Sequence, residues 1–234
     1  MANTTYLMAW PMAALIAMAS LTSTAQAQVA PSALEAARYT GLFAAAHQGE
    51  LAKAKKLLAA GANVNARDPY GRTAVHIATH AGQRELIRAL AQAGADLELL
   101  ENDRYDAVTI AAVADDEDSL RVLLGLGASA KLTTSRYDGT ALIAAAHLGH
   151  DGVVKQLIAA GAPLDHVNNL HWTALIEAIV LGNGGPRHQE VVRALLAAGA
   201  STRLTDREGN TPLTLAKTRA YSAMVSLLTQ AGAK

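Results

Sequence analysis

The chain has 234 residues, of which 51% are hydrophobic and only 4% are aromatic. Its core must therefore consist of alanine, leucine, isoleucine and valine, which suits closely stacked helices better than a domain with large core side chains. Basic and acidic residues number 20 each, so the net charge is zero and no charge excess points to nucleic acid or an anionic membrane as partner. The absence of cysteine excludes disulfide bonds and thiol chemistry.

The first 27 residues differ in composition from the rest. Residues 6–21 are apolar and uncharged, and Ala-Gln-Ala at 25–27 fits the small-x-small pattern of a signal peptidase site. We therefore expect a bacterial signal peptide at 1–27, a mature chain at 28–234, a periplasmic or secreted location and no stable membrane insertion after cleavage. Because no Lys or Arg precedes the apolar run, an uncleaved anchor is the alternative, although the run is short and interrupted by Pro11.

A repeated unit organises the mature chain and is clearest at residues 68–95. Asp-Pro-Tyr-Gly at 68–71 is a turn sequence, and Thr73 stands where the N-cap of a short helix belongs. Gly82 ends this helix, and a second helix with one apolar side ends at Gly94. Helices this short are marginal alone, so the unit needs neighbours to bury its apolar faces.

The unit occurs six times, at spacings of about 33 residues. One extra residue precedes the fourth cap position, and five extra residues precede the sixth. The N-cap position is occupied by Thr40, Thr73, Asp106, Thr140, Thr173 and Thr211, and the terminal glycine by Gly61, Gly94, Gly127, Gly161, Gly199 and Gly232. This is the pattern of a repeat protein.

Several of these segments resemble ankyrin repeats. They are Thr-Ala-Val-His at 73–76, Thr-Pro-Leu-Thr at 211–214, Leu-Leu-Ala-Ala-Gly-Ala at 57–62 and 195–200, and Asn-Val-Asn-Ala at 63–66. The resemblance implies an all-α solenoid of about six helix–turn–helix repeats, joined by β-turn or hairpin-like loops, that binds other proteins. It also implies that His76 bonds to the preceding turn. The six units expected are 34–67, 68–100, 101–134, 135–167, 168–205 and 206–234.

Two units depart from the pattern, and unit six ends the array. In unit three Arg104, Asp106 and Asp115 replace the turn glycine, the cap threonine and the middle glycine, so we expect it to be the least regular. The acids at 115–118 are expected to favour the start of a helix rather than to bind a cation. In unit five the insertion at 183–188 is expected to extend the loop between the helices. Unit six is expected to present a polar outer face through Lys217, Arg219 and Gln230.

A partner is expected along the turns and the first helices. In a stacked array the turns project as tips, and the first helices line a concave palm beside them. Four aromatic residues on consecutive tips favour an interface, although tip aromatics could instead brace neighbouring tips. The expected partner-binding residues are Tyr70, Arg72, Asp103, Tyr105, Tyr137, Leu170 and Trp172 on the tips, and Ile77, His80, Ile110, Val113, His147 and Glu177 in the palm.

Two other functions compete with this interpretation. His47, His80 and His147 occupy equivalent places and could serve a metal or small-ligand carrier, but no HExxH motif is present and no carboxylate stands at matching spacing. The third alternative is a self-assembling structural protein. Because the sequence shows no nucleophile elbow, dinucleotide fingerprint or other catalytic motif, we expect a non-enzymatic protein. We also expect it to be a monomer without cofactor or metal. Its expected partner is a periplasmic or envelope protein.

Overall fold

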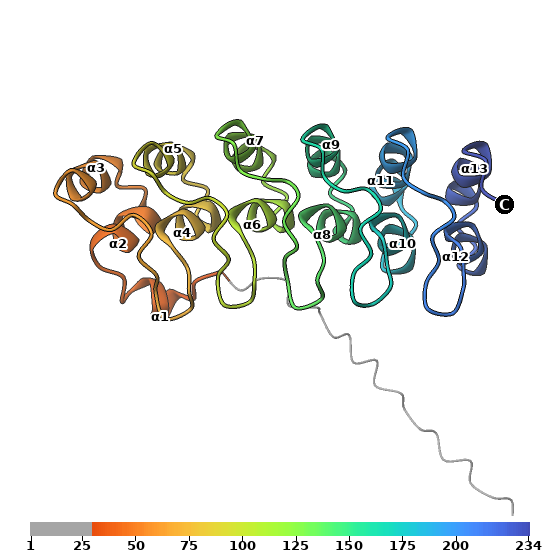
Figure 1. Ribbon diagram of the computed structural model, residues 1–234, viewed down its shortest axis with the longest axis horizontal. Coiled ribbons are helices and arrows are strands. Elements are labelled where there is room, and N and C mark those ends of the chain that lie inside the picture. The colour runs from red at the N-terminus through yellow and green to blue at the C-terminus, as the bar shows by residue number, and fades with distance from the viewer. Residues whose placement is uncertain (1–29) are drawn as a thin grey trace, which may run out of the picture.

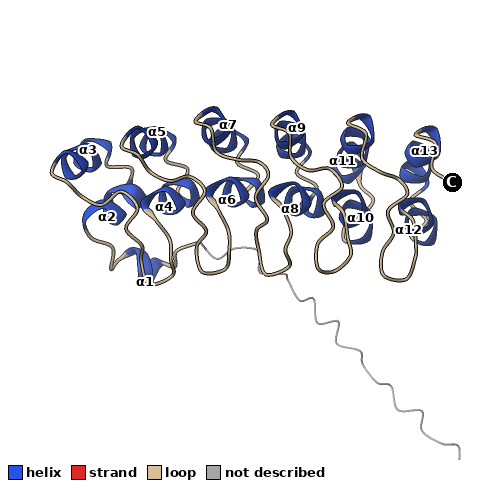
Figure 2. Cartoon of the chain, viewed as in Figure 1, coloured by secondary structure: helices blue, strands red, loops and turns tan. Residues whose placement is uncertain are grey.

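The computed structural model describes residues 30–234, so the expected signal peptide at 1–27 lies outside the described residues. Within 30–234 the chain forms thirteen helices and no strand (Figures 1 and 2). The helices are α1 (Ala33–Ala36), α2 (Gly41–Gln48), α3 (Leu51–Ala59), α4 (Ala74–His80), α5 (Arg84–Gln92), α6 (Ala107–Val113), α7 (Glu117–Gly125), α8 (Ala141–Leu148), α9 (Asp151–Ala159), α10 (Ala174–Val180), α11 (Pro186–Ala197), α12 (Pro212–Thr218) and α13 (Ser222–Gln230).

The helices form two parallel rows. The first helices of the units pack against one another in chain order and form one row; they are α2, α4, α6, α8, α10 and α12 (Figure 1). The second helices form the other row; they are α3, α5, α7, α9, α11 and α13. Each first helix also packs against the second helix of its own unit. The expected all-α solenoid of helix–turn–helix units is thus confirmed.

An alanine at one equivalent place lets the first helices approach closely. This place lies five residues after each cap and is fully buried in all six units, at Ala45, Ala78, Ala111, Ala145, Ala178 and Ala216. A methyl group fills the contact between neighbouring helices without pushing them apart, so close packing continues along the array. Larger apolar side chains such as Leu90, Leu123 and Leu157 fill the space between the two rows and are also fully buried.

The expectation that unit three would be the least regular is wrong. Helices α6 and α7 have seven and nine residues, the same lengths as α4 and α5 in unit two. Asp106 replaces the cap threonine because its carboxylate accepts the Thr109 amide at 2.9 Å. Arg104 and Asp115 adopt the left-handed conformation, with φ of 67° and 56°, that glycine adopts in other units. The acids at 115–118 lie at the start of α7, as expected, with Asp116 as its N-cap.

The expectation of an extended loop in unit five is confirmed in part, because the loop between α10 and α11 has five residues, 181–185, against two or three between the helices of the other units. The other additional residues lengthen α11 to twelve residues, with Gly185 at the N-cap and Pro186 in the first turn, where its fixed φ suits a helix start. Arg187 reaches back over unit four and forms ion pairs with Asp115 at 2.8 Å and Asp151 at 3.2 Å. The insertion therefore connects three consecutive units.

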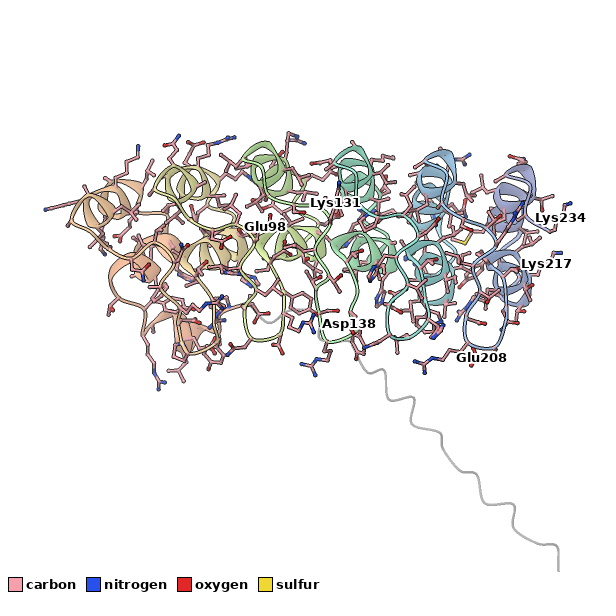
Figure 3. All side chains as sticks on the ribbon, viewed as in Figure 1. Glu98, Lys131, Asp138, Glu208, Lys217 and Lys234 are labelled. Carbon is pink, nitrogen blue, oxygen red and sulfur yellow. The ribbon has the colours of Figure 1, made fainter. Side chains whose placement is uncertain are left out.

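The two ends of the array are finished differently. At the N-terminal end, α1 is a single turn closed by a capping box between Ser32 and Glu35. At the C-terminal end, Lys217, Arg219 and Gln230 are exposed as expected, and Figure 3 shows Lys217 projecting from the last unit. Within residues 30–234, none of the helices has the length and apolar character needed to cross a membrane.

Candidate functional site: the tip ridge and the concave face

Each turn is held together by the side chain of its first residue. In unit two the Asp68 carboxylate accepts the backbone amides of Tyr70 and Arg72, both at 2.9 Å. Asn168 and Asp206 bind the equivalent amides of units five and six in the same way. The conformation of the tip in these three units therefore depends on a local Asx-type turn.

Backbone hydrogen bonds join the turns of units two to five into one ridge. The carbonyl of Tyr70 accepts the Asn102 amide at 3.0 Å, and the carbonyl of Tyr137 accepts the Asn169 amide at 2.9 Å. Between these pairs, the Arg104 carbonyl accepts from the amide that begins the turn of unit four. We call residues 68–72, 101–105, 135–139 and 168–172 the tip ridge; Figure 3 labels Asp138, which lies in its unit-four turn.

Most of the expected tip residues are accessible on this ridge. Tyr70 and Tyr137 are 47% and 46% exposed, and Asp103 is exposed as well. Tyr105, Leu170 and Trp172 are half-buried. In the palm, Val113, His80 and His147 are likewise half-buried. These side chains therefore expose part of their aromatic and apolar surface, and hydrogen bonds between the tips hold the backbone of the ridge in place.

Four of the residues expected to be exposed are buried. Arg72 pairs with Asp68 at 2.8 Å and lies 4.4 Å from the centre of the Tyr70 ring, so it braces its own turn. Ile77 and Ile110 are fully buried, because α4 and α6 are enclosed by the first helices on either side. The fourth, Glu177, is buried in the palm. The expectation of exposure is wrong for these four.

A groove of about 230 Å³ lies between the tips of units two and three. It is lined by Glu35, Tyr70, Arg72, His80, Glu101, Asp103, Tyr105 and Ile110. A hydrogen bond from Tyr70, the Ser32 amide and the nearby Arg72 lower the pKa of Glu35 to about 2, so its carboxylate is ionised. Burial, with His76 and Arg72 nearby, lowers the pKa of His80 to about 4 and leaves it neutral at pH 7.

Sequence reasoning missed Glu35 and Glu101 in this groove. Glu35 lies on α1, ahead of the first repeat, and reaches the turn of unit two, where it comes within 3.4 Å of Arg72. No periodic signal marks it, because α1 has no counterpart in the other units. Glu101 begins a turn, and its carboxylate accepts the Asp103 and Tyr105 amides at 3.0 Å. Its place is equivalent to that of Asp68, so the repeat alignment locates it.

A carboxyl and an imidazole meet in the palm of units four and five. Glu177 Oε2 lies 3.5 Å from His147 Nδ1, and Glu177 Oε1 accepts from Asn168 Nδ2 at 2.8 Å. Burial raises the pKa of Glu177 to about 7, although the bond from Asn168 opposes that rise. Burial also lowers the pKa of His147, as do the neighbouring His188 and His150. Aligning the six units did not pair Glu177 with His147, because the two residues occupy different places in their units.

Two exposed leucines adjoin this pair and were also missed. Leu148 and Leu181 are 36% and 43% exposed, at the ends of α8 and α10. Both stand eight residues after their cap threonine, a place that faces the palm, so the repeat pattern could have identified them. They give the palm of units four and five an apolar border.

Four histidines bond to backbone carbonyls through a ring nitrogen; they are His76, His150, His166 and His188. His76 accepts the amide of Thr73, the N-cap that directly follows the turn, at 3.0 Å, and its other nitrogen donates to the Leu99 carbonyl. His150 and His188 donate to carbonyls of the preceding units, both at 2.9 Å. Residues 30–234 contain no group of three His, Asp or Glu side chains arranged to hold a metal ion.

Comparisons with known proteins identify the family that the chain matches. The model of ankyrin repeats in three copies matches residues 18–101, 42–136 and 108–206. YahD of Escherichia coli strain K12, an ankyrin repeat protein, is 43% identical over 99 residues, which are 42% of this chain and 49% of that protein. The matched segment thus spans about half the length of that curated relative.

Solved structures agree over most of the chain. An ankyrin repeat domain from Acinetobacter baumannii is 44% identical with a TM-score of 0.78, covering 82% of this chain and 98% of that one. A chain of the complex between the Bdellovibrio bacteriovorus endopeptidase Bd0816 and the immunity protein Bd3460 is 25% identical with a TM-score of 0.69, at the same coverages. The repeat spacing, the two rows of helices and these matches together show that the chain belongs to the ankyrin-repeat family.

Proposed function

We propose that this protein is a non-enzymatic binding module that holds a partner protein against the tip ridge and the concave palm. The ankyrin fold is generally a scaffold for protein–protein interactions, and the proposal assigns that role to particular residues. The observation that carries it is the series Tyr70, Tyr105, Tyr137 and Trp172, partly exposed on four consecutive tips. Tyrosine and tryptophan dominate binding energy at interfaces.

The rigidity of the ridge supports the proposal. The backbone bonds that join Tyr70 to Asn102 and Tyr137 to Asn169 fix the aromatic residues relative to one another. A surface ordered before binding loses less conformational entropy when the partner arrives, so more of the contact energy appears as affinity. The apolar border at Leu148 and Leu181 continues this surface into the palm. The related chain in the Bd0816–Bd3460 complex fits such a role.

A capture experiment tests this function. The purified protein is immobilised and exposed to a periplasmic extract, beside a tip variant with Tyr70→Ala, Tyr137→Ala and Trp172→Ala. The matched control carries Arg88→Ala, Arg121→Ala and Lys155→Ala, three exposed positions on the second helices α5, α7 and α9. Circular dichroism first establishes equal helicity in all three proteins.

We expect the wild type and the control to retain one partner that the tip variant loses. Equal retention by the tip variant, or loss by the control, would refute binding through the tip ridge. The same samples are measured by light scattering over a range of concentrations. A constant monomer mass is expected, whereas oligomers that grow with concentration would favour the self-assembling alternative.

We further propose that the protein is exported, on the basis of the apolar segment and the Ala-Gln-Ala sequence at 25–27. The test is N-terminal sequencing of the protein recovered from periplasmic and cytosolic fractions. A periplasmic protein that begins at Gln28 is the expected result. A protein that retains residues 1–27 and sediments with membranes would instead establish the anchor.

A further inference from the structure

We propose that the groove between the tips of units two and three receives a basic side chain, an arginine or a lysine, of the bound partner. This inference rests on the proposed function, because it specifies the chemistry of the partner at one end of the tip ridge. The groove lining combines carboxylates from α1 and from the turn of unit three with two tyrosine rings.

The charges that line the groove favour a cation. The groove is lined by three carboxylates, those of Glu35, Glu101 and Asp103, and by one guanidinium, that of Arg72. A second guanidinium, that of Arg136, pairs with Asp103 at 2.9 Å from outside the lining. Arg72 is already paired with Asp68 at 2.8 Å. Within residues 30–234 Glu101 forms no ion pair, since its oxygens bond only to the backbone amides of its own turn. The negative charge of the groove is therefore only partly neutralised.

The two tyrosines add a specific preference for guanidinium and ammonium groups. Aromatic faces attract cations through the negative potential above the ring, and arginine is the commoner partner. Tyr70 already makes this contact, since the Arg72 guanidinium carbon lies 4.4 Å from its ring centre. Tyr105, on the next tip, lines the same groove, together with Ile110. An aliphatic stem can pack on Ile110 while the charged head stays among the carboxylates.

The size of the groove fits one side chain. Its volume of about 230 Å³ is below the roughly 300–1,000 Å³ of pockets that enclose drug-sized ligands. A single long side chain can enter while the body of the partner rests on the tip ridge. The groove thus acts as one anchoring point within a larger interface, which is how a few residues dominate binding energy.

A carboxylate ligand is disfavoured, although one Arg72 nitrogen lacks a hydrogen bond. Arg72 Nη2 is buried without a hydrogen-bond partner, and this alone would suggest an anion. However, Glu35 lies 3.4 Å from the same nitrogen. An incoming carboxylate would also meet Glu101 and Asp103 at the groove. Repulsion between like charges therefore opposes an acidic side chain.

The test uses blocked amino acids as probes of the groove. Nα-acetyl-arginine amide, and the corresponding lysine, norleucine and glutamate compounds, are titrated into the full chain while backbone amide signals are followed by NMR. The variants are Glu101→Gln, which keeps one acceptor oxygen for the two amides of its turn, and Glu35→Gln, which keeps an acceptor oxygen for the Ser32 amide. The matched control is Glu208→Gln at the exposed tip of unit six, far from the groove (Figure 3).

We expect the arginine and lysine probes to shift the amide signals of Gly71 and Tyr105, with affinity that falls as salt rises. Each groove variant should weaken arginine binding by about two- to fivefold, the effect of losing one partly exposed charge, and Glu208→Gln should not. Equal binding of norleucine, tighter binding of glutamate, no shift at all, or equal effects of Glu101→Gln and Glu208→Gln would each overturn the proposal.

Failure of this inference is distinguishable from failure of the proposed function. If the captured partner is lost by the tip variant but retained by Glu101→Gln and Glu35→Gln, the tip ridge binds a partner and the groove takes no basic side chain. If the tip variant retains its partner, the proposed function itself is refuted. Because Glu35 lies on α1, its variant leaves the turn of unit three intact, and a groove effect seen in both variants cannot come from disturbing that turn.

Discussion

Replacing Glu177 with glutamine should stabilise the protein, and increasingly so as the pH rises from 4.5 to 8. The Glu177 side chain is only 7% exposed, so its ionised form is poorly solvated. Burial accordingly raises its pKa from 4.5 to about 7. Glutamine is nearly isosteric and keeps an oxygen to accept the 2.8 Å bond from Asn168 Nδ2. The substitution thus removes only the ionisation.

The magnitude follows from proton linkage. Below pH 4.5 the carboxyl is protonated in both folded and unfolded states, and its burial costs nothing extra. Between pH 4.5 and 7 the unfolded state releases the proton that the folded state keeps, so the free energy of unfolding falls as pH rises. Above pH 7 both states are ionised and the penalty is constant. A pKa raised from 4.5 to about 7 corresponds to on the order of 3 kcal/mol.

His147 does not offset this penalty at neutral pH. Its Nδ1 lies 3.5 Å from Glu177 Oε2, close enough for an ion pair if the imidazole were protonated. Burial and the neighbouring His188 and His150 lower its pKa from the ordinary value of 6.5. The ring is therefore neutral at pH 7 and above, and the carboxylate gains no counter-charge from it.

Urea unfolding followed by circular dichroism, at pH 4.5, 6, 7 and 8, measures the effect. The two proteins should be nearly equal at pH 4.5 and differ by on the order of 3 kcal/mol at pH 8. The control Glu208→Gln removes an exposed carboxyl and should change stability by less than about 0.5 kcal/mol at every pH. If Glu177→Gln is less stable than the wild type at pH 8, the carboxylate is ionised and paired with a protonated His147, and the reasoning fails.

Three further substitutions test the packing, the caps and the unit-five insertion. Leu123→Ala should cost about 2–5 kcal/mol in urea unfolding, because the side chain is fully buried between the rows; a cost below 1 kcal/mol would contradict close packing there. Asp106→Ala should cost about 0.5–2 kcal/mol through loss of the bond to the Thr109 amide, while Asp106→Thr retains most of the stability. Arg187→Gln should lower the free energy of unfolding by at most about 1 kcal/mol, and by less at high salt, because the Arg187 side chain that pairs with Asp115 is 52% exposed. A salt-independent loss would indicate a packing role for Arg187 instead.

The sequence alone determined the repeat architecture. Turn residues, cap residues and terminal glycines act through bonds between residues a few positions apart, so the pattern is readable without knowing the packing. Asp68 closing its turn and Thr140 capping α8 are of this kind. The recurrence of these signals about every 33 residues then required the units to stack, since no single unit can bury its apolar faces.

Only the tertiary structure decided which repeat positions are accessible. Equivalent places differ in exposure because each is covered by the neighbouring unit, and that cover depends on the side chains present there. Ile77 is fully buried, whereas His80, three residues later on the same helix, is half-buried beside the groove.

The candidate site also depends on contacts between distant parts of the chain. Glu35 of α1 reaches Arg72 in the turn of unit two, and Glu177 of unit five contacts His147 of the adjacent unit four. Arg187 reaches Asp115 over a whole intervening unit. Repeat spacing places backbone positions, but the reach of a side chain, the charge it meets and its burial are properties of the packed array.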